Sequence, residues 1–395
     1  MSGGVTPTSK LSIGLTKLGP VKFFLGAVAE KWLPLPKEGM AGKERVTRAI
    51  EFLGPHKVPH QKRDFWHLFH MPPQSWQPPS GYYPYVHPAI VQTRSWKWEE
   101  RKDIKWLDET RTAIDEFGTV WKTSGLTSLG ETLKGPIEDG WEALEDYKLP
   151  DMKDWNRFKR SAYWAGRLKG DRYCLGVDVN SIWERFRYLR GFENAMMDLV
   201  LHPEEVKKLM SLLTDMTIDI VENYKKAGAH GFMLVDDWGT QRGPFISPKH
   251  FQEFFQPCYK RITDRCHELD MHCGMHSCGD LKPLVPHMIE SGLDFLELDS
   301  PDMCGIDWLS ENAAGKICLF CSVDIQNVYP TNDLEKIEDY VKQLIRKLGD
   351  HNGGLVAWPY SEPWVIGIGH RAEKMERKSF ERYGEYPLDI DSPKR

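Results

Sequence analysis

The most regular pattern in this sequence is an alternation of short apolar runs with longer amphipathic stretches from about residue 170 onward. Apolar and β-branched runs of this length, each ending in polar residues, are typical of strands buried in a parallel sheet. Amphipathic segments between them predict helices that return the chain for the next strand. Six such units predict an α/β fold, specifically a (β/α)₈ TIM barrel. The expected strands are residues 173–179, 231–237, 271–277, 294–299, 316–324 and 354–360, and the clearest helices are residues 203–226, 248–269 and 333–349.

The first 150 residues carry a different pattern. Residues 43–54 are expected as a helix and residues 58–65 as the first strand, and a segment rich in Pro, Trp and Tyr follows. Strand–helix alternation is not convincing between about 70 and 150, where residues 112–124 are expected as a hairpin. The expected domains are an N-terminal helical arm over 1–55 and a barrel over 56–395, with an aromatic-rich insertion at about 70–150 over one mouth of the barrel.

Composition and charge narrow the class of protein. Hydrophobic residues make up 41% of the chain and charged residues 28%, which is ordinary for a globular protein. Apolar runs stay well short of the roughly 18 residues that cross a bilayer, and the apolar patch at 21–28 contains a basic residue and precedes no cleavage site. A net charge of −5, with Lys and Arg interleaved among Asp and Glu, gives no broad basic face. We therefore expect a cytoplasmic protein that binds neither membranes nor nucleic acid.

The strongest candidate for chemistry closes the third expected strand, where His276 and Cys278 stand two residues apart. Residues at this spacing on a strand share a face, so both side chains are expected to point into the mouth of the barrel, where such enzymes have their active sites. The pair is suited to zinc, although a zinc site needs three or four protein ligands and the same pair also occurs in ordinary packing. Candidates for a third ligand are Cys321, which equally well fills the core, together with Asp299 and Glu362.

A second candidate is the end of the preceding strand, where Asp236, Asp237, Trp238 and Gln241 follow an apolar run. Burying carboxylates is costly unless they bind something. We expect the two acids to transfer a proton, orient a ligand or hold His276 by a hydrogen bond, and we expect the indole and the amide to contact substrate. The alternative is that an acid here caps a helix.

Three other positions carry weaker signals. Asp178 and Asn180 lie at a strand end where a substrate binds, but a cap for the helix that starts at residue 182 is the first interpretation. Tyr360 and Glu362 follow the last strand, where they are candidates to protonate a leaving oxygen, and a surface loop is equally compatible. His272 lies deeper on the strand of the His-x-Cys pair and is expected to be a hydrogen-bonded core histidine.

Four segments together resemble the uroporphyrinogen decarboxylase superfamily. HSCG is the most specific of them, because it is similar to the His-x-Cys motif of zinc-dependent methyltransferases that exchange a methyl group with a corrinoid protein. The resemblance covers residues 43 to about 385 and implies zinc at His276 and Cys278 and a corrinoid carried by a partner protein, while Cys321 or Glu362 would have to supply the third ligand. The segments are KERVTRAIEFLGPHKVP at 43–59, LVDDWGTQ at 234–241, HSCG at 276–279 and CSVDIQ at 321–326.

Two departures from the family pattern bear on the reaction. The decarboxylases carry an R-Q-A-G-R segment soon after the first strand, whereas residues 61–74 here are QKRDFWHLFHMPPQ. A substrate with many carboxylates needs bidentate cationic partners, so the missing arginines argue against decarboxylation of an acidic tetrapyrrole. Thiol-methylating relatives take a third ligand from a P-G-C-G turn, whereas residues 359–362 here are PYSE. This difference favours relatives that remove a methyl group from small donors such as methoxylated aromatics.

The expected function is therefore a methyltransferase that moves a methyl group from a small methylated substrate, a methoxylated aromatic, to a corrinoid protein. One alternative is a porphyrinoid decarboxylase, which needs Arg or Lys at the mouth of the barrel and no metal. Others are a thiol-methylating corrinoid methyltransferase and a non-catalytic carrier of a corrinoid or tetrapyrrole. A homodimer is compatible with the sequence, which fixes neither the oligomeric state nor the methyl donor.

Overall fold

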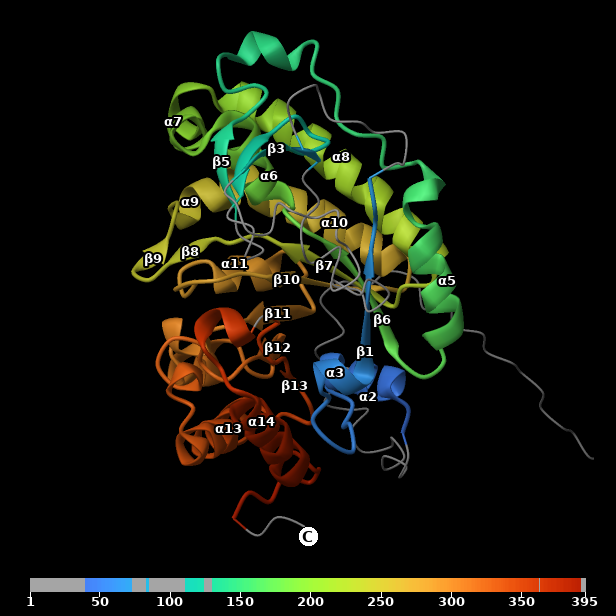
Figure 1. Cartoon of the computed structure of the whole chain (residues 1–395), viewed down its shortest axis with the longest axis vertical. Helices are drawn as coiled ribbons and strands as arrows, with labels where there is room; N and C mark the ends of the chain where they lie inside the picture. Colours follow the sequence, from blue (N-terminus) through green and yellow to red (C-terminus); the bar gives the residue numbers. More distant parts are fainter. Residues whose placement is uncertain (1–39, 73–82, 85–110, 124–129, 362, 392–395) are drawn as a thin grey trace, which may run out of the picture. The chain divides into compact units, whose positions relative to one another are not determined.

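A curled sheet of seven parallel strands forms the centre of the protein (Figure 1). The computed structural model describes residues 40–72, 83–84, 111–123, 130–361 and 363–391. The strands follow one another in the sheet in chain order, and each sequential pair is joined by a parallel register. They are β1 (Phe65–Phe69), β6 (Tyr173–Asp178), β7 (Gly231–Val235), β10 (His272–His276), β11 (Phe295–Leu298), β12 (Cys318–Cys321) and β13 (Leu355–Ala357). All six strands expected after residue 170 are confirmed.

The first strand begins later than the sequence suggested. Residues 61–64 form the short helix α3 (Gln61–Asp64), where the side chain of His60 accepts a hydrogen bond from the N–H of Lys62, and β1 starts only at Phe65. The segment before α3 instead meets the last strand: the N–H of Ala357 donates to the carbonyl of Pro59 over 2.9 Å, and His60 forms a parallel bridge with Ala357. This contact links β13 back to the start of the sheet, as a barrel requires.

Alternate residues of each strand face the inside and the outside of the curled sheet. The inner set packs against the helix α2 (Gly42–Ile50), whose Val46, Ala49 and Ile50 are buried. This helix therefore closes the inner core. Because one face of it is buried, its apolar residues recur at helical spacing, which is the amphipathic pattern that the sequence shows at 43–54. The inner residues are Phe65, Tyr173, Leu175, Val177, Met233, Phe295, Cys318, Phe320, Val356 and Trp358.

The outer residues of the strands pack against the crossover helices. Figure 1 shows α8 and α10 lying together beside the sheet, with α13 and α14 grouped near its last strands. Sequence signals set several boundaries: Pro203 starts α8, Gly228 in the left-handed region (φ 98°) ends it, and Asp333 caps α13. The helices are α5 (Lys159–Leu168), α6 (Ile182–Arg190), α7 (Phe192–Leu201), α8 (Pro203–Ala227), α9 (Pro248–His250), α10 (Gln256–Glu268), α11 (Val285–Glu290), α12 (Ile306–Asn312), α13 (Leu334–Leu348) and α14 (His370–Tyr383).

The helix expected over 248–269 is present as one continuous helix, and its hydrogen-bonding pattern changes along its length. It starts at α9, passes through a π-helical turn at Phe251–Phe255 and continues as α10. The Ser247 side chain accepts a hydrogen bond from the N–H of His250 and so caps the start. Pro257 has no N–H to donate, and it lies directly after the π-helical turn, where the hydrogen-bonding pattern of the helix changes.

The expected insertion before residue 150 holds a small separate sheet. Its strands are β2 (Tyr83–Pro84), β3 (Arg111–Ile114), β4 (Val120–Thr123) and β5 (Gly130–Lys134). The hairpin expected at 112–124 is confirmed by the antiparallel pairing of β3 with β4. Buried Asp115 accepts hydrogen bonds from Thr119 N–H and Trp121 Nε1 and pairs with Arg185 of α6, which ties the hairpin to the barrel. Residues 73–82, 85–110 and 124–129 of the insertion, and residues 1–39 of the expected arm over 1–55, lie outside the described residues.

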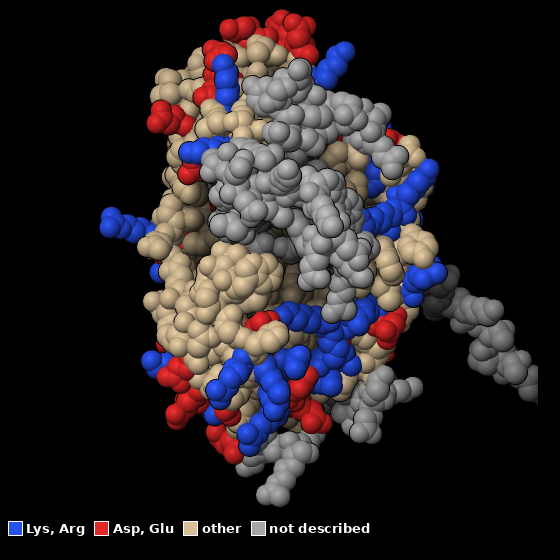
Figure 2. Space-filling view, viewed as in Figure 1, with Lys and Arg blue, Asp and Glu red and all other residues tan. Residues whose placement is uncertain are grey.

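Charged side chains on the surface are locally grouped. On the face shown in Figure 2, Lys and Arg gather where Figure 1 places α2, α3 and α14. Acids are interleaved with them, as in the pairs of Arg48 with Glu44 (3.1 Å) and of Lys62 with Glu373 (3.0 Å). None of the helices in the described part of the chain combines the length and apolarity needed to cross a bilayer.

Asp236 supplies the cap of α6 from a different element. Its two carboxylate oxygens accept hydrogen bonds from the N–H groups of Ile182 and Glu184, each over 3.0 Å, and the Tyr259 hydroxyl donates to it over 2.7 Å. The side chain is fully buried, and burial raises its pKa to about 8 even though these donors favour the ionised form. The helix-cap interpretation of this acid is therefore the one that the geometry supports.

Replacing Asp236 by Ala should lower the free energy of unfolding by about 2–3 kcal/mol, because two buried N–H groups lose their acceptor. The matched control is Asp333→Ala, which removes the exposed cap of α13 and should cost about 1 kcal/mol. Urea unfolding followed by circular dichroism measures both. A loss for Asp236→Ala no larger than that of the control would contradict the role assigned to this carboxylate.

Candidate functional site

Three neighbouring strands bring their polar ends together at the mouth of the barrel. In the parallel register, His276 at the end of β10 lies opposite Val235 of β7 on one side and Glu297 of β11 on the other. Asp237 follows Val235 by two residues, so it continues the inward-facing side of β7. The expectation that the side chains at 276 and 278 meet the carboxylates of adjacent strands is confirmed.

His276, Cys278 and Asp237 form a compact group. The Nε2 atom of His276 lies 3.5 Å from Cys278 Sγ and 3.3 Å from Asp237 Oδ1, and the three ligand atoms lie within 4.8 Å of one another. The Cys278 N–H donates to the same Asp237 oxygen over 2.9 Å. The imidazole is 15% exposed and the carboxylate 41%, so the group borders solvent at the mouth.

The turn after the His-x-Cys pair depends on two glycines. Gly279 adopts φ 94°, in the left-handed region, and lies directly against Gly239 beyond the end of β7. A Cβ atom built on Gly239 would come within 2.6 Å of the Cys278 carbonyl oxygen, closer than real Cβ contacts. The Gly239 N–H also donates to that carbonyl over 3.0 Å. Both glycines therefore allow the turns that carry Asp237 and Cys278 to approach.

Glu297 holds the other side of the imidazole. Its carboxylate bonds to His276 Nδ1, and its side chain is 3% exposed. Burial alone would lower the pKa of His276, but the negative charge of Glu297 and the hydrogen bonds to Asp237 and Cys278 raise it well above 6.5. A histidine fixed by a carboxylate at one nitrogen presents the other nitrogen in a defined direction, which is how metal-binding histidines are usually held.

The charges of the group are strongly coupled. Burial would raise the pKa of Asp237, but the hydrogen bond and positive charge of His276 lower it to about 2. Burial and the charge of Asp237 raise the pKa of the Cys278 thiol to about 12. Asp299, two residues beyond Glu297, lies within ligand distance of His276 and Glu297, and burial together with the charge of Glu297 raises its pKa well above 3.8. These shifts favour the protonated forms of His276 and Asp299 and the ionised form of Asp237.

The expected third ligand, Cys321, lies elsewhere. It is fully buried in the outer core with Leu319, and its strand neighbours Cys318 and Phe320 face inward in its place. Among the described residues that gather donor atoms around His276 and Cys278, Asp237 occupies the position for which Cys321 was expected. The core interpretation of Cys321 is therefore correct.

Most of the other expected site residues lie away from this group. Asp178 is buried on the outer side of β6, where burial raises its pKa to about 7, and Asn180 occupies the left-handed region at φ 64°. Neither caps α6, since Asp236 does. Trp238 is fully buried, stacks on Trp183 at 4.8 Å and donates to Tyr259.

Three remaining expectations concern loops and the deep end of the barrel. Gln241 is exposed in the hairpin between β8 (Gly239–Thr240) and β9 (Gly243–Pro244). Tyr360 is partly buried just beyond β13, and Glu362 lies outside the described residues. His272 is hydrogen-bonded as expected, with its ring 2.7 Å from the Tyr173 hydroxyl and 3.0 Å from Glu51, but it is partly exposed and does not lie in the core.

Glu297 is the site residue that sequence reasoning missed. It stands in the apolar strand DFLELD, two residues after Phe295 and two before Asp299. Phe295 belongs to the inner core, so the alternation places all three on the inner side. A single acid within an otherwise apolar strand was the available signal, because an acid is rarely buried there without a partner.

Comparison with known proteins gives a consistent family. The family model for uroporphyrinogen decarboxylase (URO-D) matches residues 132–359. A methylated-thiol–coenzyme M methyltransferase from Methanosarcina mazei is 23% identical over 177 residues, which are 45% of this chain and 46% of that protein. A uroporphyrinogen decarboxylase from Xanthomonas oryzae pv. oryzae is 26% identical over 257 residues, covering 61% of this chain and 67% of that protein.

A solved structure supports the same fold. A methyltransferase from Methanosarcina mazei superposes with a TM-score of 0.52 at 13% identity, covering 64% of this chain and 72% of that one. The sequence match to the coenzyme M methyltransferase spans about half the length of that relative, so its activity does not transfer directly. The family model, in contrast, covers more than half of the present sequence. The chain belongs to the uroporphyrinogen decarboxylase family.

Proposed function

We propose that this protein is a methyltransferase that takes a methyl group from a small methylated substrate, a methoxylated aromatic, and passes it to the corrinoid of a partner protein. The observation that carries the proposal is the group of Asp237, His276 and Cys278 at the mouth of the barrel. A thiol and an imidazole held together on one strand end match the motif of methyltransferases in this family. The similarity to a relative named as a methyltransferase supports the same class of reaction.

The donor atoms fit a zinc ion. Zinc binds Cys, His and carboxylate ligands at about 2.0–2.3 Å in a tetrahedron, which puts neighbouring donor atoms about 3.3–3.8 Å apart. The separations of His276 Nε2 from Asp237 Oδ1 (3.3 Å) and from Cys278 Sγ (3.5 Å) lie in that range. Three protein ligands leave a fourth position for substrate, as in catalytic zinc sites. When bound there, zinc would act as a Lewis acid toward the oxygen that leaves when the methyl group departs.

The chain's own residues have separate tasks around this position. Glu297 holds Nδ1 of His276 and so fixes the direction of Nε2. Burial and the charge of Glu297 raise the pKa of Asp299 well above 3.8, which favours a proton on this carboxyl beside the site. The leaving group of an aryl methyl ether is a phenoxide, and a nearby carboxyl proton stabilises it. Tyr360 and Glu362 stay predicted alternatives for the proton donor.

The acids at the mouth argue against the decarboxylase alternative. Porphyrinogen substrates carry many carboxylates and need cationic partners. Here Asp237, Glu297 and Asp299 gather at the ends of adjacent strands. Even with Asp299 protonated, two anions would repel an acidic tetrapyrrole. An uncharged aryl methyl ether meets no such repulsion.

Purified protein supplied with zinc should retain a stoichiometric amount, and Cys278→Ala should lose it. The matched control is Cys321→Ala, which removes a buried thiol that lies outside the group and should keep the metal. Elemental analysis of the two variants and the wild type is the measurement. Equal loss in both variants, or none in either, would refute the ligand set Asp237, His276 and Cys278.

Replacing Glu297 by Gln should weaken zinc binding roughly 10- to 100-fold, because the imidazole loses the carboxylate that orients it and raises its basicity. Glu376→Gln is the matched control: Glu376 is also a buried carboxyl, but it lies on α14 and accepts a hydrogen bond from Tyr329. Competition with a chromogenic chelator gives both affinities. Similar affinities for the two variants would show that Glu297 does not support the metal.

The wild-type protein should convert cob(I)alamin to methylcobalamin when given 2-methoxyphenol, with the change followed by visible absorbance. His276→Ala should slow the conversion roughly 100-fold or more, because the charge that stabilises the leaving oxygen is lost. His370→Ala, which alters a fully exposed histidine, should leave the rate unchanged. Release of carbon dioxide from uroporphyrinogen without any methyl transfer would instead establish the decarboxylase alternative.

A further inference from the structure

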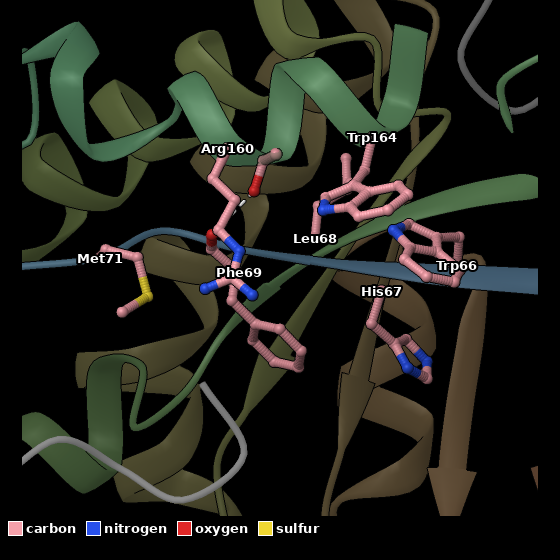
Figure 3. Close-up of a pocket in the computed structure, with 8 residues that line it drawn as sticks. Trp66, His67, Leu68, Phe69, Met71, Arg160 and Trp164 are labelled. Atoms are coloured by element: carbon pink, nitrogen blue, oxygen red, sulfur yellow. Dashed lines mark hydrogen bonds between the residues drawn. The ribbon is translucent and has the colours of Figure 1, made fainter. Parts of the chain in front are cut away.

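The helix α5 is fixed to β1 by one face and exposed on the other (Figure 3). Trp164 of the helix lies 5.4 Å from Trp66 of the strand, ring centre to ring centre, and the Ser161 hydroxyl donates to the Phe69 carbonyl over 2.7 Å. The pocket left between the two elements has room for about one water molecule. These contacts hold the helix in place and leave its opposite face open to a partner.

The exposed face of α5 carries positive charge and an aromatic ring. Lys159, Tyr163 and Arg167 follow one another at intervals of four residues, so they line one face of the helix. Tyr163 is 53% exposed, and the guanidinium of Arg167 lies 4.6 Å from the centre of its ring. Among the described helices of ten or more residues, only α5 contains neither Asp nor Glu. Its cations without an ion pair to any described residue are Lys159, Arg167 and the following Lys169.

A second patch has the opposite charge. The segment 138–146 holds five acids and neither Lys nor Arg. Asp139 pairs with Lys134 over 2.7 Å, which ties the segment to β5, and Leu133 of that strand is 52% exposed. The exposed acids of the segment that form no ion pair with a described residue are Glu142, Glu145 and Asp146.

The two patches lie apart in one molecule. Figure 1 places the segment 138–146 at the top of the view and α5 at the right, and Figure 2 shows acids gathered at the first place and Lys and Arg at the second. No ion pair joins the two patches in the described part of the chain. Their charges therefore stay uncompensated within a single copy, and each patch complements the other.

A partner that fits both patches must offer a basic and an acidic surface. Nucleic acid or an anionic membrane would be attracted to α5 but repelled by the segment 138–146. A second copy of this chain offers both surfaces, because a two-fold axis sets the same two patches against each other twice. Residues 138–146 and 159–169 are 20 residues together, which is close to the roughly 20–30 that each side of a standard interface uses.

We propose that two copies of this protein form a two-fold symmetric dimer in which α5 of each copy contacts the segment 138–146 of the other. Acids of one copy pair with the cations of α5 in the other, and the exposed Tyr163 and Leu133 add the apolar contacts that interfaces also use. A single exposed ion pair contributes little, so the contact depends on several pairs that the symmetry doubles. This inference does not depend on the proposed methyl transfer.

Sedimentation velocity of the full-length protein measures the association. The wild type should be a dimer in about 50 mM NaCl, and about 500 mM NaCl should raise its dissociation constant roughly ten-fold or more, because salt screens exposed charges. Lys159→Glu combined with Arg167→Glu should raise the constant roughly 100-fold, because like charges then face each other across the contact. Glu142→Lys combined with Glu145→Lys should have the same effect for the same reason.

Mixing the two double variants is the sharpest test. The reversed patch of each variant is opposite in charge to the patch that it meets on the other, so an equimolar mixture should form a heterodimer although neither variant associates alone. The matched control combines Lys374→Glu with Lys378→Glu. It reverses two exposed cations of α14 and should leave the dissociation constant unchanged.

Three outcomes would overturn the proposed dimer. They are a wild type that stays monomeric at high protein concentration in low salt, a dimer that neither double variant weakens, and a mixture of the folded variants that stays monomeric. If a double variant does not fold, a wild-type dimer whose dissociation constant does not respond to salt overturns the proposal instead.

Discussion

The bond between buried Glu297 and His276 is the interaction on which the site depends. A carboxylate that is almost fully buried is tolerated when a positive or hydrogen-bonding partner compensates its lost hydration. Glu297 has that partner in His276 Nδ1, and the register of β10 with β11 places the two residues opposite each other. The bond leaves only Nε2 for Asp237 and Cys278. The direction in which His276 Nε2 points is therefore fixed by residues of the barrel strands and not by the loops above them.

Asp236 and Asp237 are adjacent in the chain, and because side chains alternate along a strand, one has a structural role and the other lies in the candidate site. Asp236 points outward and caps α6, while Asp237 points inward and meets His276 and Cys278. The outward acid is fully buried among helix N–H groups and a tyrosine hydroxyl, so it serves stability. The inward acid remains partly exposed at the mouth, where a ligand has access. One residue of shift would exchange these tasks, because the side-chain period of a strand is two.

Family membership by itself leaves the reaction open, because proteins named as decarboxylases and as a methyltransferase both resemble this chain. The side chains at the mouth therefore carry the functional argument. A soft thiol beside an imidazole favours a metal such as zinc, and neighbouring acids disfavour substrates with many carboxylates. These features support the proposed methyl transfer from an uncharged donor.

The sequence by itself determined the strands after residue 170, the hairpin at 112–124, the main helices and the His276–Cys278 pair, because each leaves a local signal in the spacing of apolar residues or in caps and turns. Only the tertiary structure decided which side of the sheet Cys321 and Asp236 face. Strands buried on both faces are apolar throughout, so the sequence shows no alternation from which to read direction. Glu297 and Asp237 likewise became partners of His276 only through the register between strands, which connects residues far apart in the chain by hydrogen bonds that no local pattern records.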